Sequence, residues 1–384
     1  MTKEWIISSD SHVLEPDDLF KPIARKYGDQ LPGYRNKHLG KSGQFYFTGL
    51  EYIQVDEIVE GDETPAKKKL QETLIRASMD PYARIECIDQ DGVWAEVLNS
   101  TWMLYTMRAA NDRMVEDCCR LYNDWVGEMA SANPTRFKAT AMIHMADVDW
   151  ACRELDRVAK KGHVAVLVNC DSRPEWAPYR DKKYDKFWAR CQAHKIPPTL
   201  HIITGNIRDP FTLFGKEREE LPKLTIQILS ESFPVLANEF IFGGIMDRFP
   251  KLHVVLSEYE VSWIPYVLFR MYQIEGPFAD ALKFKRPKRK VDDYMERVWH
   301  GFVDDAFVKA AVDAVGSKNL MWGSDFPHAR CTYPNSQKVV QKTLAKLGKK
   351  AMDDLAYYNC ARLYGIDLPK SRKVPAKGLK LAAE

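Results

Sequence analysis

Eight short apolar runs recur along the chain, and each is bounded by turn signals or polar residues. They lie at residues 5–10, 93–99, 138–144, 164–169, 198–203, 253–258, 297–302 and 320–325. Their short length and their content of β-branched and aromatic residues are typical of buried strands. The pattern therefore predicts eight buried strands.

Longer segments with apolar residues at three- and four-residue intervals lie between these runs. The clearest is 112–137; residues 149–163 begin at an aspartate cap and end at Gly162, and residues 303–319 end in the same way at Gly316. Strands that alternate with helices pair in parallel through crossover connections. Eight such units predict an α/β fold, the (β/α)8 TIM barrel. A doubly wound open sheet is the alternative, but no glycine-rich phosphate loop follows any of the runs.

Residues 20–90 do not follow this alternation. They contain a polar, glycine-rich stretch, which we interpret as an insertion after the first strand that covers the barrel mouth. Long insertions in compact domains are usually lids or partner surfaces. We therefore expect one barrel domain over residues 1–367 and a basic C-terminal arm over residues 368–384. The insertion and the arm offer surface beyond what the barrel needs, so we expect a homo- or hetero-oligomer.

Composition and charge exclude several classes of protein. Of the 384 residues, 45% are apolar, which supplies a sizeable core and excludes a disordered chain. The net charge is +3 and the basic residues are dispersed, so we expect no nucleic-acid partner. The basic stretch 283–290 is interpreted as a solvated loop between helices. No apolar run approaches the roughly 20 residues that span a bilayer, so we expect no membrane partner.

The eight cysteines have no regular spacing and form no CxxC pair. Several of them lie in or beside apolar segments. Reduced, buried thiols are the simplest interpretation. The first residues lack the apolar core of a signal peptide. We therefore expect a cytoplasmic location.

Residue types that bind metal ions stand at the ends of four predicted strands. Side chains two residues apart on a strand point the same way, so the pair at the end of the first strand faces one side. The carboxyl ends of barrel strands meet at one mouth, and carboxylates and imidazoles bind borderline divalent metals. The residues are Asp10, His12, His201, Glu258, Asp325 and His328. We therefore expect a metal centre at the barrel mouth, with Glu258, Asp325 and His328 as catalytic acid–base candidates.

Three further residues are candidates for contact with a small-molecule substrate. Trp102 and Tyr105 follow the second predicted strand, where they line the pocket or pack in the core. Arg330 lies near the end of the eighth strand. Its guanidinium group either binds a substrate carboxylate with two hydrogen bonds or forms a structural salt bridge.

For four other polar or aromatic residues, the indications of a role in the site are weaker. Glu15 is a further candidate carboxylate, or it caps a helix that begins near residues 16–17. His144 stands at the end of the third predicted strand, so it faces the mouth or the barrel wall. His300 lies in the middle of a strand, where packing is expected, and Trp263 fits helix packing better than substrate binding.

Four motifs together resemble the amidohydrolase superfamily. They are DSHVLEP (10–16), HIITG (201–205), FIFGGIMDRFPKLHVVLSE (240–258) and MWGSDFPHARCTYPNS (321–336). Their order is similar to the branch that includes aminocarboxymuconate semialdehyde decarboxylase and the resorcylate and carboxyvanillate decarboxylases. The similarity runs from about residue 5 to about residue 365. It independently implies the (β/α)8 fold and a metal site.

The resemblance also implies roles for individual residues. The family's first-strand HxH pair falls on Asp10 and His12, so an aspartate replaces the first histidine. The fifth-strand histidine ligand falls on His201. The eighth-strand aspartate, a ligand that also orients or activates water, falls on Asp325. The sixth-strand histidine that handles protons in the decarboxylases falls on Glu258, which puts direct transfer of their mechanism in question.

The charge of the site bears on the number of metal ions. Three carboxylates and up to three histidines can hold more charge than one divalent ion supplies, and crowded carboxylates raise one another's pKa values. The superfamily's usual two-metal bridge is a carbamylated lysine on the fourth strand, but residues 164–170 contain no lysine, so Glu258 would have to help bridge. We expect one ion by default and two as the alternative, with Zn, Mn or Fe as the metal.

Four functions stay open. In a metal-dependent hydrolase, Asp325 would accept a proton from the attacking water. In a non-oxidative decarboxylase of a small carboxylated substrate, Glu258 or Asp325 would protonate the carbon. A monooxygenase with an Fe/Fe or Fe/Mn pair is compatible with the same ligands. A non-catalytic subunit is the fourth reading, although the retained His12, His201 and Asp325 argue against it. We place hydrolysis or decarboxylation first and oxygenation second.

Overall fold

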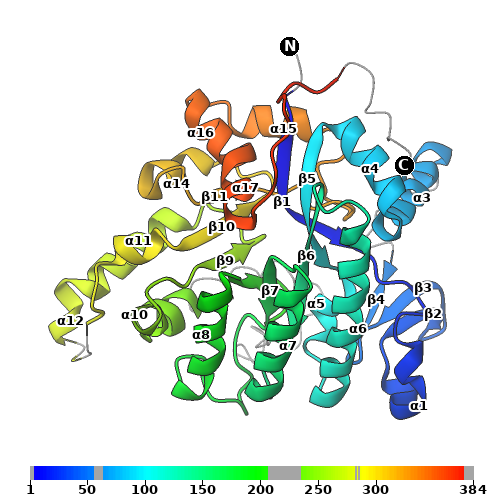
Figure 1. The fold of residues 1–384 in the computed structure, drawn as a ribbon, viewed down its shortest axis with the longest axis horizontal. Coiled ribbons are helices and arrows are strands. Elements are labelled where there is room, and N and C mark those ends of the chain that lie inside the picture. Colours follow the sequence, from blue (N-terminus) through cyan, green and yellow to red (C-terminus); the bar gives the residue numbers. More distant parts are fainter. Residues whose placement is uncertain (1–3, 56–63, 206–234, 282, 284–285, 376–384) are drawn as a thin grey trace.

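The computed structural model describes residues 4–55, 64–205, 235–281, 283 and 286–375. One parallel sheet contains eight strands in the order β1-β5-β6-β7-β8-β9-β10-β11 (Figure 1). These are β1 (Ile6–Val13), β5 (Val93–Ser100), β6 (Phe137–Ile143), β7 (Ala165–Val168), β8 (Pro198–His201), β9 (Val254–Ser257), β10 (Val298–Phe302) and β11 (Leu320–Trp322). Each strand overlaps one of the eight apolar runs, so the strand predictions are confirmed.

The sheet closes on itself through the segment that follows β11. The backbone N–H of Asp325 donates to the carbonyl oxygen of Asp10 at 3.0 Å, and that of His12 donates to the carbonyl oxygen of Phe326 at 2.5 Å. The closed sheet excludes the doubly wound alternative and confirms the (β/α)8 barrel. The last strand is shorter than predicted, because residues 324–325 bond with β1 instead of continuing the ladder with β10.

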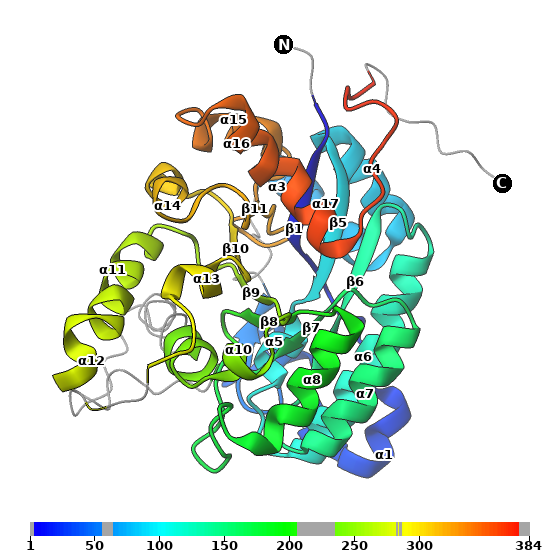
Figure 2. The same cartoon turned by 60° about the vertical axis from the view of Figure 1, so that its left-hand side comes forward.

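Helices surround the barrel, and α6, α7 and α8 lie side by side along one flank (Figures 1 and 2). The α-helices are α1 (Ala24–Tyr27), α3 (Pro65–Met79), α4 (Pro81–Asp91), α5 (Trp102–Thr106), α6 (Asp112–Ser131), α7 (Val148–Lys160), α8 (Asp185–His194), α10 (Ile245–Arg248), α11 (Ile264–Glu275), α12 (Pro277–Ala281), α13 (Val291–Met295), α14 (Val308–Val315), α15 (Ser336–Thr343), α16 (Lys349–Asp353) and α17 (Asn359–Tyr364). Short 3-10 and π segments are η1 (Lys21–Ile23), η2 (Gly28–Gln30), η3 (Lys182–Tyr184), η5 (Leu236–Ile241) and η6 (Asp354–Tyr358).

Two predicted helix starts are wrong by a few residues. The cap of α7 is Asp147, whose side chain accepts from the backbone N–H groups of Asp149 and Trp150, so the helix begins before the predicted position. Helix α14 begins only at Val308, because Asp305 lies outside it and accepts hydrogen bonds from other backbone groups. The predicted ends are confirmed, since α14 stops at Gly316 and α7 stops shortly before Gly162.

The barrel interior has its own hydrophobic core. Ile7 on β1 and Val255 on β9 belong to one cluster of buried residues, together with Met321 on β11. Strands β1 and β9 are not neighbours in the sheet, so these side chains meet across the barrel. The same cluster includes Tyr364 of α17. A larger cluster joins the outer side chains of the strands to the surrounding helices.

The predicted insertion contains a separate antiparallel sheet of β2 (Gly33–His38), β3 (Lys41–Phe47) and β4 (Tyr52–Gln54). Tyr34 of this sheet accepts a hydrogen bond from the indole N–H of Trp102 at 2.8 Å, and Tyr46 stacks on the same indole. The sheet therefore packs near the carboxyl end of β5. Helix α4 ends just before β5 and packs against it, so the separate sheet accounts for only part of residues 20–90. A covering role stays a prediction, and residues 56–63 lie outside the described residues.

The described part of the C-terminal arm returns to the start of the chain. Trp5 donates its backbone N–H to Arg372 at 2.7 Å, and Arg372 pairs with Asp353 at 2.7 Å. Residues 376–384 of the arm, and 284–285 of the basic stretch, lie outside the described residues. All eight cysteines are described and free, and seven are buried, as the sequence predicts. Among the described residues, no helix has the length and apolar character needed to span a membrane.

Candidate metal centre

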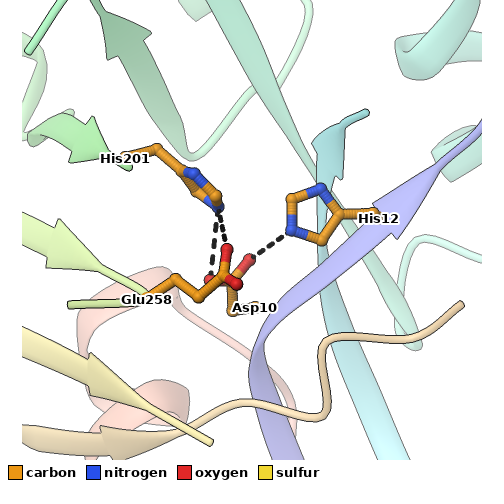
Figure 3. A group of neighbouring side chains, drawn as sticks. All are labelled: Asp10, His12, His201 and Glu258. Atoms are coloured by element: carbon orange, nitrogen blue, oxygen red, sulfur yellow. Dashed lines mark ion pairs between the residues drawn. The ribbon is translucent and has the colours of Figure 1, made fainter. Parts of the chain in front are cut away.

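The six residues predicted for the metal centre lie together at the carboxyl ends of the barrel strands. They form two overlapping groups, and within each group the possible ligand atoms lie within 4.8 Å of one another. The groups are Asp10, His12, His201 and Glu258, and His12, Asp325 and His328. Figure 3 shows the first group, in which the four side chains point toward one another.

The two histidines of the first group direct the same type of nitrogen into the cluster. Nδ1 of His12 lies 2.6 Å from the carbonyl oxygen of Ser100. Nδ1 of His201 lies 3.0 Å from the carbonyl oxygen of Ile202. A carbonyl oxygen only accepts hydrogen bonds, so each Nδ1 carries a proton, and in the neutral ring each Nε2 offers a lone pair. Metal-binding histidines are held in this way by backbone carbonyl groups.

Asp10 lies between these two histidines. Its Oδ1 is 3.2 Å from Nε2 of His12, and its Oδ2 is 3.4 Å from Nε2 of His201. Asn99 donates to Oδ1 at 2.6 Å, and Ser257 donates to Oδ2 at 2.7 Å. Burial raises the pKa of the Asp10 carboxyl group, but the two histidines lower it more and hold it well below its usual range. Asp10 is therefore a carboxylate that is fixed in position.

Asp325 and His328 form the other side of the cluster. Oδ1 of Asp325 lies 3.6 Å from Nε2 of His12 and 2.7 Å from Nδ1 of His328. The ring of His328 stacks on that of His12 with 4.1 Å between centroids, and its Nε2 lies 3.0 Å from the hydroxyl group of Thr101. Burial and the neighbouring His328 lower the pKa of His12, which favours the neutral imidazole that binds a cation.

Glu258 follows β9 at the more open edge of the cluster. Its Oε2 lies 3.5 Å from Nε2 of His201, and its side chain is 20% exposed. Its backbone φ is +64° and that of Asp325 is +55°, a conformation that non-glycine residues adopt rarely and often at functional sites. Burial, followed by the charges of Asp325 and Asp10, raises the pKa of Glu258 well above its usual range. Glu258 therefore keeps a proton to higher pH than an ordinary carboxyl group.

The donor set fits a divalent metal ion. Among the described residues, Nε2 of His12, Nε2 of His201 and Oδ1 of Asp325 are buried and make no hydrogen bond of acceptable geometry. Leaving a buried polar atom unpaired costs ~1–3 kcal/mol, a penalty that a bound cation would offset. Imidazole nitrogen and carboxylate oxygen serve Zn, Mn and Fe alike. The structure therefore supports a divalent metal without distinguishing among these three.

Glu15 lies outside the cluster. Its carboxylate accepts hydrogen bonds from the backbone N–H groups of Trp102 and Met103, each at 3.0 Å, and from the hydroxyl group of Ser100. It therefore caps α5. The prediction that it caps a helix beginning near residues 16–17 is wrong, because the chain forms only a turn there.

The two aromatic candidates on α5 have different surroundings. Trp102 is fully buried and stacks on Tyr46 with 4.4 Å between ring centroids, so it packs in the core and does not line the mouth. Tyr105 is partly exposed. Burial, followed by the charge of Glu258, raises its pKa, which places the hydroxyl group in the field of the cluster.

The remaining candidate residues, Arg330, His144 and His300, have different surroundings. Arg330 is exposed, and it forms no salt bridge with the described residues. His144 is buried and contacts Asp112 at 2.9 Å, so it meets the start of α6 instead of the cluster. His300 is buried beside Trp263 with 5.6 Å between ring centroids, which confirms the packing role.

Sequence reasoning missed the buried polar network behind His12. Arg84 on α4 donates from Nε to Glu96 at 2.6 Å and from Nη1 to the carbonyl oxygen of His12 at 2.8 Å. Glu96 also accepts from the hydroxyl group of Ser11 at 2.9 Å. The network ties α4 and β5 to the strand that carries two candidate ligands. Its one signal in the sequence is a charged residue, Glu96, inside an apolar run.

Proteins of similar sequence cover most of the chain. The family model described as Amidohydrolase matches residues 97–366, which is more than half of the chain. A gamma-resorcylate decarboxylase from Polaromonas sp. is 26% identical over 265 residues, which cover 64% of this chain and 76% of that protein.

Solved structures extend the likeness to the whole fold. An amidohydrolase from Mycobacterium avium subsp. paratuberculosis superposes with a TM-score of 0.75 at 18% identity, over 96% of this chain and 99% of that one. A dihydroxybenzoic acid decarboxylase from Polaromonas sp. with bound manganese superposes with a TM-score of 0.64 at 18% identity, over the same shares. At such identities the likeness supports the fold, and the family follows from the model match: this chain belongs to the amidohydrolase family.

Proposed function

We propose that this protein is a metal-dependent enzyme that removes CO2 from a small aromatic carboxylic acid without oxidation. The observation that carries the proposal is the cluster of buried histidine nitrogens and carboxylate oxygens at the barrel mouth, with a protonatable carboxyl group, Glu258, at its edge. The similarity to a gamma-resorcylate decarboxylase, and to a decarboxylase structure with bound manganese, supports the same reaction class.

Four residues would hold the metal ion. These are Asp10, His12, His201 and Asp325, whose candidate ligand atoms converge in the two groups described above. When bound there, a divalent ion supplies positive charge that attracts the substrate carboxylate and polarises an adjacent hydroxyl group. Asn99 and Ser257 keep Asp10 in place through their hydrogen bonds, so the ligand geometry does not depend on Asp10 alone.

Glu258 would supply the proton that replaces CO2. As the bond between the ring carbon and the carboxylate breaks, its electron pair stays on the carbon, and a new C–H bond takes the proton of the Glu258 carboxyl group. The carbon needs a proton donor, and the burial and neighbouring carboxylates of Glu258 favour its protonated form. Its side chain is 20% exposed, so the resulting carboxylate can regain a proton from water.

Arg330 and Tyr105 would contribute to substrate binding. Arg330 is exposed and lies two residues after His328 in the chain. It has no ion pair among the described residues, so its guanidinium group is free to bind a second acidic group of the substrate. Tyr105 is partly exposed on α5, the helix that follows the carboxyl end of β5, and it offers a ring and a hydroxyl group for substrate contact. The oligomer, the cytoplasmic location and the covering role of residues 20–90 stay predictions.

The decisive experiment measures CO2 release and dioxygen uptake in one vessel. Manganese-loaded protein is incubated with 2,6-dihydroxybenzoate, 5-carboxyvanillate and related acids. We expect one CO2 per product molecule, no dioxygen uptake, and loss of both metal and activity in His201→Ala. Stoichiometric dioxygen uptake, or acid products of amide or ester cleavage without CO2, would instead favour the oxygenase or the hydrolase.

Glu258→Gln separates proton transfer from metal binding in the same assay. The amide keeps an oxygen that can contact the cluster but cannot donate a carboxyl proton. We expect the rate to fall by ~10²–10⁴-fold, as for loss of a general acid, with the metal content unchanged. A fall from two ions per chain to one in this variant would show that Glu258 bridges two metals and is not primarily a proton donor.

A further inference from the structure

A second cavity lies at the opposite end of the barrel from the candidate metal centre. Its volume is about 440 Å³, which falls within the range of small-molecule sites. It is formed by the end of α8, the residues just before β8 and β9, the start of β10, and α17. All barrel strands are parallel, so their amino ends share one face and the metal centre occupies the other.

The cavity carries positive charge that no acidic side chain neutralises. Lys195, Lys251 and Arg362 line it, and no aspartate or glutamate does. In the described part of the chain, none of these three cations forms an ion pair. Cations gathered at a concave surface with an apolar wall raise the local concentration of anions. The cavity therefore favours an anionic ligand over a cationic one.

One wall of the cavity is aromatic and holds a hydrogen-bond donor in place. The indole N–H of Trp299 donates to Nδ1 of His253 at 2.9 Å. An indole nitrogen cannot accept, so the proton of the neutral His253 imidazole resides on Nε2, which has no partner among the described residues. The guanidinium group of Arg362 lies 5.2 Å from the centre of the Trp299 ring. Burial, and then the charges of Arg297 and Arg362, lower the pKa of His253, in agreement with a positive local field.

We infer that this cavity binds a small planar organic anion, such as an aromatic carboxylate. Lys195, Lys251 and Nε2–H of His253 face its charge, and the ring lies against Trp299 and Leu363. A purely apolar ligand would leave the cations unused, and a simple inorganic anion would leave the apolar wall uncovered. The inference does not depend on the reaction at the metal centre, because no residue of that centre lines the cavity.

Calorimetric titration of the full-length His201→Ala variant with 2-naphthoate tests this site. The His201→Ala background removes binding of the probe at the metal centre and leaves the second cavity intact. We expect 2-naphthoate to bind in this background with one site per chain. The neutral 2-naphthamide, which has the same shape, should bind at least tenfold more weakly. The double variant Lys195→Glu/Lys251→Glu should weaken 2-naphthoate binding by at least tenfold.

Matched variants distinguish this site from general charge effects. Lys346→Glu changes an exposed lysine that does not line the cavity, and it should leave the affinity unchanged. Leu363→Trp places an indole ring in the cavity and should weaken binding by at least tenfold without any change of charge. Equal binding of 2-naphthamide, unchanged binding in the double variant, or displacement by phosphate at the same concentration as by 2-naphthoate would each overturn the inference.

Discussion

A single methyl group at position 323 tests the geometry that holds Asp10 at the candidate metal centre. Gly323 follows β11, and a Cβ atom built on it would lie 2.6 Å from Cβ of Asp10 and 3.2 Å from its backbone N and O atoms. Ordinary contacts begin near 3.4 Å, so Gly323→Ala must push Asp10 away by roughly 0.8 Å. Metal–ligand distances tolerate only about 0.2 Å.

The displacement has two measurable consequences. Crowding a packed interior typically destabilises the folded state by about 1–3 kcal/mol, so the urea midpoint of the metal-free protein should fall. Misplacing a ligand should weaken metal binding by ~10–100-fold, the effect seen when a ligand loses its support. We would measure Mn²⁺ affinity by competition with a chelating dye and confirm folding by near-ultraviolet circular dichroism.

Gly348→Ala is the matched control for this prediction. A Cβ atom at Gly348 meets no atom within 4 Å, and the residue has an ordinary φ of −69°. Its metal affinity should match that of the parent protein. If Gly323→Ala also bound Mn²⁺ as tightly as the parent with an unchanged midpoint, the packing of β11 against Asp10 would be wrong, and with it the position assigned to this ligand.

Three further predictions use other contacts. Arg84→Met leaves the buried carboxylate of Glu96 uncompensated, so urea unfolding should show a loss of about 3–5 kcal/mol, and a loss under 1 kcal/mol would contradict the network. Ser257→Ala removes a donor to Asp10 and should weaken Mn²⁺ binding by about tenfold with little change in fold. Burial lowers the pKa of His300 from 6.5 to about 3, so folding stability falls as the pH drops below 6.5. Between pH 7 and pH 5, the free energy of unfolding of His300→Leu should therefore fall by about 2 kcal/mol less than that of the parent. Equal falls would refute the lowered pKa of His300.

The strands were predictable because each buries its side chains almost completely. A strand such as β7 is apolar throughout, so its composition alone marks it. The error at β11 has a tertiary cause, since Ser324 and Asp325 bond to β1, far away in the sequence. The start of α7 was misplaced because Asp147 and Asp149 are both good caps, and only the structure shows which one binds the first N–H groups.

The candidate ligands could be predicted from the sequence, but the residues that hold them in position could not. His201 and Asp325 stand out because a polar residue at the end of an apolar strand is unusual and because barrel strand ends converge. Asn99 and Ser257 occupy similar positions, but amide and hydroxyl groups are common there and carry no such signal. Arg84 was out of reach, since its partner Glu96 lies on another element and no local spacing links the two.

The backbone at Glu258 and Asp325 connects these observations. Glu258 directly follows β9, and Asp325 lies three residues after the end of β11. Both have positive φ angles, a conformation that costs ~1–3 kcal/mol for side chains of this kind. Local propensity opposes it, so the surrounding packing must maintain it. Both side chains belong to the cluster, where burial and then the neighbouring carboxylates raise the pKa of Glu258. At these two candidate positions the fold overrides local preference, so residue type identified them but sequence pattern could not describe their geometry.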